Sequence, residues 1–168
     1  MPFLIPPTKT ETMDNAQDKA LNTLNDLVET ARDGQKGYET AAGAVDNPSV
    51  KAELERFAQQ RAIFVSELES KAQQLGGSTR NTTTLEGAAL QAAGAVHRGW
   101  INLKAAVGAN DSKAILGECE TGDEAALKAY DAALHEQGLP VDLKTVVQRQ
   151  YQEIQAAKQT ITSLKERL

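Results

Sequence analysis

The sequence predicts an all-α protein that folds as an antiparallel bundle of long helices. Along four long segments, apolar residues recur at alternating steps of three and four, which is the spacing of one buried helix face. The chain is rich in good helix formers, and its five prolines fall at the N-terminus and between the segments. The turns within each pair of segments are short, so paired helices are expected to run antiparallel.

Local signals set the expected ends of these helices. Asn47 and Pro48 are a plausible N-cap and first helical residue for the second helix, and Gly76-Gly77 ends it. Asp111 is the expected N-cap of the next core helix, and Gly138-Leu139-Pro140 forms the last turn. The predicted core helices are about 15–45, 48–75, 111–137 and 141–167.

A fifth helix is predicted at about 84–107, between the two hairpins. Its apolar stripe is narrow and rich in alanine, so we expect it to cross over along the outside of the bundle. Two hairpins joined by a long crossover are the arrangement of a ferritin-type bundle. Residues 14–168 would then form one domain, which suits a chain of 168 residues.

Residues 1–13 are expected to form a non-helical arm, because Pro2, Pro6 and Pro7 interrupt them. Two interpretations of this arm stay open. It is either a loose tail or an apolar segment, Phe3-Leu4-Ile5, that docks on a neighbouring subunit. The second interpretation would make the chain an assembly protein that forms homo-oligomers or associates weakly with itself.

Charge and composition exclude several classes of partner. Acidic and basic residues alternate, the net charge is −5, and no basic stripe is present, which argues against nucleic-acid binding. No run of about 18 apolar residues predicts a membrane span. A single cysteine, Cys119, fits a reducing compartment, and with no signal peptide apparent we expect a cytoplasmic protein. Acidic neighbours on both sides of Cys119 favour a buried structural thiol over a reactive one.

Each core helix has one polar interruption near the middle of its apolar face. These residues are Gln35, Arg61, Asp123 and Gln150, and their depths in the two hairpins are similar. Because buried polar groups must be paired, we expect one polar layer in which Arg61 bonds Asp123 and two amides brace the pair. Gly34 and Gly122 would let a bulky neighbour approach this layer. The alternative is that these glycines only allow close helix packing.

Two Gly-containing stretches also carry a resemblance. "DGQKGYETAA" and "ETGDEAALKAY" resemble the Gly-Glu pairs of rubrerythrin-type ferritin-like proteins. Over about residues 20–165 the chain is also similar to an uncharacterised bacterial ferritin-like family of unknown function. The resemblance implies a ferritin-like four-helix bundle and suggests a bacterial, stress-associated role. In that superfamily the glutamates, with Glu-x-x-His on the other two helices, bind a di-iron centre.

The residues of such a metal centre are mostly missing from this chain. Gln35 and Asp123 stand where the resemblance places the two glutamates, and no Glu-x-x-His occurs; the corresponding windows are "RAIF" (61–64) and "YQEI" (151–154). Of the two histidines, His135 suits the C-terminal end of its helix and His97 is read as a structural or surface residue. If a metal bound, the available carboxylates would be Glu29, Asp33, Glu120, Asp123 and Glu124.

These observations favour a non-catalytic bundle, acting as a structural or binding protein with a degenerate metal site and no cofactor. The alternative is a di-iron or di-manganese carboxylate protein that handles oxygen or peroxide.

Overall fold

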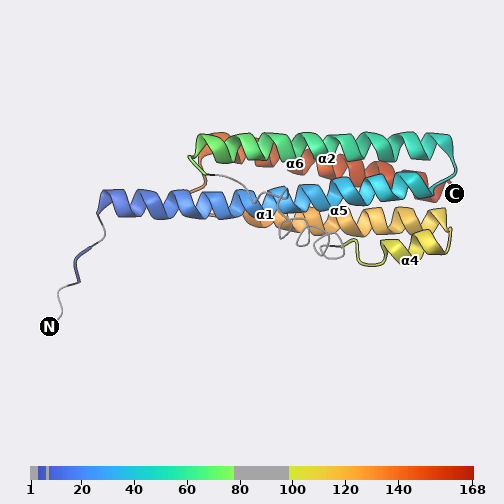
Figure 1. The fold of residues 1–168 in the computed structure, drawn as a ribbon, viewed down its shortest axis with the longest axis horizontal. Coiled ribbons are helices and arrows are strands. Elements are labelled where there is room, and N and C mark those ends of the chain that lie inside the picture. The colour runs from blue at the N-terminus through green and yellow to red at the C-terminus, as the bar shows by residue number, and fades with distance from the viewer. Residues whose placement is uncertain (1–3, 7, 78–98) are drawn as a thin grey trace, which may run out of the picture.

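The structure, a computed structural model, describes residues 4–6, 8–77 and 99–168 (Figure 1). Within these residues all regular secondary structure is helical. The four long helices are α1 (Lys9–Ala44), α2 (Pro48–Gln74), α5 (Ser112–Leu134) and α6 (Val141–Glu166), and the short α4 covers Leu103–Gly108. The predicted all-α bundle is therefore confirmed.

The long helices form two antiparallel hairpins, α1–α2 and α5–α6 (Figure 1). The hairpins meet mainly through α1 and α5, whereas α2 and α6 touch only slightly. The short α4 packs against α5 and α1, near the end of the bundle where α1 turns into α2. None of the described helices is both long and apolar enough to cross a membrane.

The predicted caps account for the starts of α2 and α5. Asn47 Oδ1 accepts hydrogen bonds from the backbone N–H groups of Ser49 (2.9 Å) and Val50 (3.2 Å), with Pro48 in the first turn. Asp111 Oδ1 accepts from the N–H of Ala114 at 3.2 Å. Both helices therefore begin where side-chain acceptors satisfy backbone donors that would otherwise lack partners.

Helix α1 begins earlier than predicted, at Lys9 and not near residue 15. The sequence contains no proline or glycine between Pro7 and Gly34, so nothing stops the helix from starting directly after the last proline. Residues 15–19 are exposed, and α1 extends past the ends of its neighbours (Figure 1). Leu4 and Ile5 in front of it are exposed, Phe3 lies outside the described residues, and docking of this arm on a neighbour stays a prediction.

The predicted crossover helix, 84–107, is only partly covered by the structure, because residues 78–98, with His97, lie outside the described residues. In the described part the prediction is wrong at 99–102, which is not helical. Gly99 has φ of +93°, a left-handed conformation that interrupts a helix, and only Leu103–Gly108 is helical. Helix α5 also ends at Leu134, three residues before the predicted end.

The apolar core consists of two clusters, one toward each end of the bundle. The cluster beside the α1–α2 turn includes Tyr38, Leu54, Phe57, Trp100, Leu116, Cys119 and Ile161. The other cluster includes Leu24, Leu27, Phe64, Leu68, Tyr130, Val147 and Ile154. Buried Arg61 on α2 and Asp123 on α5 lie between the residues that these helices contribute to the two clusters. They form a polar section of the core that separates the two apolar clusters.

The indole of Trp100 lies between the hairpins and explains two glycines. A Cβ built on Gly37 of α1 would lie 2.5 Å from Cδ2 of Trp100, and one built on Gly122 of α5 would overlap the same ring. The indole also packs edge-on against Tyr38, with ring centroids 5.3 Å apart. The absence of side chains at Gly37 and Gly122 therefore leaves room for the indole. For Gly122 this agrees with the prediction that the glycine lets a bulky neighbour approach.

We expect Gly122→Ala to destabilise the protein by about 1–3 kcal/mol, because the added methyl group must displace a packed indole. Gly43→Ala is the matched control, since that helical glycine is exposed and has no atom within 4 Å of a new Cβ. The control should stabilise by about 0.5–1 kcal/mol through helix propensity. Urea unfolding followed by circular dichroism measures both. Equal stability of the two variants would contradict the placement of the indole.

A buried ion pair as the candidate functional site

The centre of the bundle holds an ion pair between α2 and α5. Nη1 of Arg61 donates to Oδ1 of Asp123 at 2.9 Å, and the two side chains are only 1% and 0% exposed. The pair joins the two hairpins, because each contributes one partner. The structure thus brings together the two charged residues of the polar layer predicted from the sequence.

Tyr38 of α1 completes the bonding of Asp123. Its hydroxyl donates to the second carboxylate oxygen, Oδ2, at 2.5 Å. Burial, together with the negative charge of Asp123, holds the pKa of Tyr38 well above its usual value, so the hydroxyl stays protonated and acts as a donor. Both oxygens of Asp123 therefore accept hydrogen bonds from protein groups.

The space for the arginine side chain comes from Gly34 on α1. A Cβ built on Gly34 would lie 3.3 Å from Nη1 and 3.4 Å from Cγ of Arg61, so the arginine lies across the glycine. The guanidinium also lies near the rings of Tyr38 and Phe64, with Cζ 5.2 Å and 5.8 Å from their centroids. Burial lowers the pKa of Arg61, but the charge of Asp123, the hydrogen bond to it and the nearby tyrosines together outweigh this effect and raise the pKa, so the side chain remains a cation.

Gln150 of α6 is also fully buried, as predicted, but it bonds a different partner. Its Oε1 accepts a hydrogen bond from the hydroxyl of Tyr130 at 2.7 Å. Burial raises the pKa of Tyr130 above its usual value, which keeps this hydroxyl a donor. Gln150 therefore belongs to the polar section of the core through Tyr130 rather than by bracing the Arg61–Asp123 bond directly.

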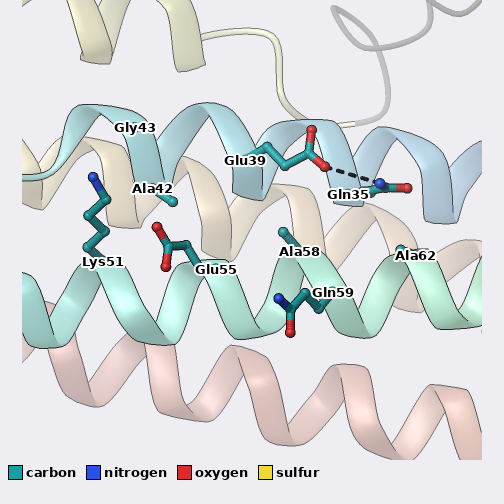
Figure 2. A pocket seen from close by; sticks show the side chains of 9 residues that line it. All are labelled: Gln35, Glu39, Ala42, Gly43, Lys51, Glu55, Ala58, Gln59 and Ala62. Carbon is teal, nitrogen blue, oxygen red and sulfur yellow. Dashed lines mark hydrogen bonds between the residues drawn. The ribbon is translucent and has the colours of Figure 1, made fainter.

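Gln35 does not join this section, and its predicted place in the layer is wrong. It is half-buried, and its Nε2 donates to Oε1 of Glu39 at 3.1 Å. Both side chains line an open groove between α1 and α2 (Figure 2), where the small side chains of Ala58 and Ala62 leave room. The volume of this groove is about 420 Å³. The buried face of α1 runs through Gly34 instead, because the glycine accommodates Arg61 from the facing helix.

The bonded Gly–polar pair on α1 is accordingly Gly37-Tyr38, not Gly34-Gln35. Its counterpart on α5 is Gly122-Asp123, and the two polar members hydrogen-bond each other. Both glycines contact the indole of Trp100. Both stretches therefore contain a glycine followed by a buried polar residue, but in the first stretch this pair lies three residues later than predicted. The hydrogen bond of Tyr38 to Asp123 was not predicted from the sequence.

The carboxylates predicted as alternative metal ligands differ in their burial and in their bonding partners. Glu120 is bonded by Lys165 (2.5 Å) and Thr162 (2.6 Å) of α6, which lower its pKa although burial acts in the opposite direction. Glu124 is exposed, and its bond with Lys158 at 2.8 Å lowers its pKa. Asp33 is buried and Glu29 half-buried, both on α1. Among the described residues, no three His, Cys, Asp or Glu side chains are grouped so as to hold a metal ion.

Cys119 lies one turn before Asp123 and is fully buried. Burial, with the charge of Asp123 as a smaller contribution, raises the pKa of the thiol well above its usual value. The thiol is therefore protonated and inaccessible, as the acidic neighbours of Cys119 in the sequence indicate. His135 caps the C-terminal end of α5, where its Nδ1 lies 2.8 Å from the carbonyl oxygen of Asp131.

Fold and site together define an all-α bundle with a buried arginine–aspartate pair at its centre. The chain belongs to the family described as Domain of unknown function (DUF2383), which matches residues 19–136. The match runs from the first third of α1 to the residues that follow α5, so it includes Tyr38, Arg61 and Asp123. No curated protein matches the chain.

Removing one member of the ion pair should cost roughly 3–5 kcal/mol of the free energy of unfolding, because the remaining charge is buried without a partner. Arg61→Leu and Asp123→Leu are the single variants. The double variant should recover much of the loss, since apolar replacements of buried pairs are often near neutral. Urea denaturation of all four proteins measures the coupling. A coupling below about 1 kcal/mol, the value of an exposed pair, would contradict a buried bond.

The raised pKa of Cys119 predicts a loss of stability in alkali. In the unfolded chain the thiol ionises near pH 8.5, whereas the buried thiol stays protonated, so its contribution is complete below about pH 8.5 and declines above it. Each further pH unit should cost about 1.4 kcal/mol until the folded pKa is reached. Tyr38 and Tyr130 add to the decline above about pH 10.

The measurement compares urea unfolding of the wild type and Cys119→Ala from pH 7 to pH 10. The variant should be less stable at pH 7 because of its cavity, but should lose less stability between pH 8.5 and 9.5. Parallel curves over that interval would show that the thiol ionises equally in both states.

Proposed function

We propose that this protein is a non-catalytic ferritin-like bundle that serves as a structural or binding protein, with a protein-only ion pair where ferritin-like relatives hold metal. The observation that carries the proposal is the bond of 2.9 Å between Arg61 and Asp123 in the centre of the core. A guanidinium is a cation that cannot be deprotonated in proteins, so it supplies the positive charge that a carboxylate in such a core requires.

The donor set supports this proposal over a di-iron or di-manganese centre. Both oxygens of Asp123 already accept bonds from protein groups. Glu120 and Glu124 are bonded to lysines of α6 and do not converge on Asp123. As the described residues are placed, these carboxylates do not fit a shared metal site.

The resemblance to bacterial ferritin-like proteins extends the proposal to a stress-associated role. In such a role the bundle would act by what it binds rather than by a reaction at its centre. The family match covers residues 19–136, from within α1 to just past α5, and leaves the partner to experiment.

Metal analysis tests the proposal directly. Protein produced with added iron and manganese, and purified without chelator, should contain far less than one metal ion per chain. Asp123→Asn removes the central carboxylate charge, and Glu55→Gln removes an exposed carboxylate that is not among the candidate ligands, as the matched control. About two metal ions per wild-type chain, retained in Glu55→Gln and lost in Asp123→Asn, would overturn the proposal in favour of a di-metal protein.

A further inference from the structure

Three buried nitrogen atoms in the polar section have no hydrogen-bond partner within the described part of the chain. They are Nε and Nη2 of Arg61 and Nε2 of Gln150, on side chains that are almost completely buried. All three are donors for which the described residues supply no acceptor. Asp123 accepts from Arg61 Nη1 and Tyr38, and Oε1 of Gln150 accepts from Tyr130.

The geometry of the guanidinium defines what would satisfy these donors. The N–H of Nε and one N–H of Nη2 are parallel, and this fork matches two oxygen atoms of one planar oxyanion. A buried donor that lacks an acceptor is costly, so the section favours a ligand that only accepts hydrogen bonds. The amide of Gln150 adds two more N–H groups from the opposite hairpin.

We propose that Arg61 and Gln150 form a buried binding site for a small monovalent oxyanion of the size of formate or nitrate. The charge of Asp123 already balances that of Arg61, so a divalent ion would leave more uncompensated charge in the core. Tyr130 connects the two residues. It bonds Gln150 directly, and the positive charge of Arg61 acts on its hydroxyl, opposing the rise in pKa that burial causes.

The proposed route to this site runs between α2 and α6, which contact each other only slightly. An open groove of about 330 Å³ there is lined by Ile63, Phe64 and Arg149, among others. Phe64 is itself buried, and its ring lies 5.8 Å from Cζ of Arg61, so it separates the groove from the guanidinium.

The inference gives the proposed binding function a ligand class, and it rests on Arg61 being held by Asp123 rather than replaced by metal. The test titrates the protein with sodium formate, against sodium fluoride at the same ionic strength, and follows the melting temperature. Formate should raise it saturably in the wild type. Line broadening of ¹³C-formate by the wild-type protein, measured by nuclear magnetic resonance, gives a second readout that needs no variant.

Two variants locate the site. Arg61→Lys keeps the charge but removes the fork, and Gln150→Glu keeps the acceptor for Tyr130 but replaces the amide donor with a carboxylate. Each should weaken the apparent Kd for formate by about tenfold or more, the loss expected for charge-assisted bonds. Gln148→Glu adds the same charge to the exposed face of α6 and is the matched control, with unchanged binding.

No saturable shift and no broadening in the wild type, or equal formate effects in Gln150→Glu and Gln148→Glu, would overturn the inference. Metal content is measured on the same samples. If the protein is free of metal and formate has no effect, only the inference of an oxyanion site is wrong. If each chain holds two metal ions, the proposed function itself is wrong.

Discussion

The rest of the bundle depends on the burial of one positive charge. Arg61 brings a guanidinium into the core, and a buried cation is tolerated only with a partner of opposite charge. Asp123 supplies that partner from the other hairpin, and Gly34 supplies the space for the arginine side chain. Sliding α2 past α5 by one helical turn, about 5.4 Å, would break the bond, so the pair selects one axial register of the hairpins.

Much of the fold was predictable because its determinants are local. Asn47, Pro48 and Asp111 act within one turn of their own positions, and the apolar period of each core helix reports its own buried face. The start of α1 was mispredicted for the opposite reason. Its first turns extend past the bundle without an apolar face, and only the position of the last proline determines where such a helix begins.

The candidate site was predictable in part. Arg61, Asp123 and Gln150 were recognisable because each breaks an otherwise apolar stripe. Gln35 was misassigned since Gly34 and Gln35 both fit steps of three and four, and only the side chain of Arg61 on another helix decides between them. The bond of Tyr38 to Asp123 and the position of Trp100 depend on contacts between distant segments, which a helical period does not contain.

The position of Trp100 makes the protein a natural reporter of its own assembly. It is the single tryptophan of the chain, and it contacts the first hairpin at Gly37 and the second at Gly122. Helix formation within either hairpin needs only local contacts, which form quickly, whereas enclosure of the indole requires that both hairpins be in place. Intrinsic fluorescence therefore records the docking of the hairpins, and circular dichroism records the formation of their helices. A time lag between the two signals during refolding would separate these two events without any added label.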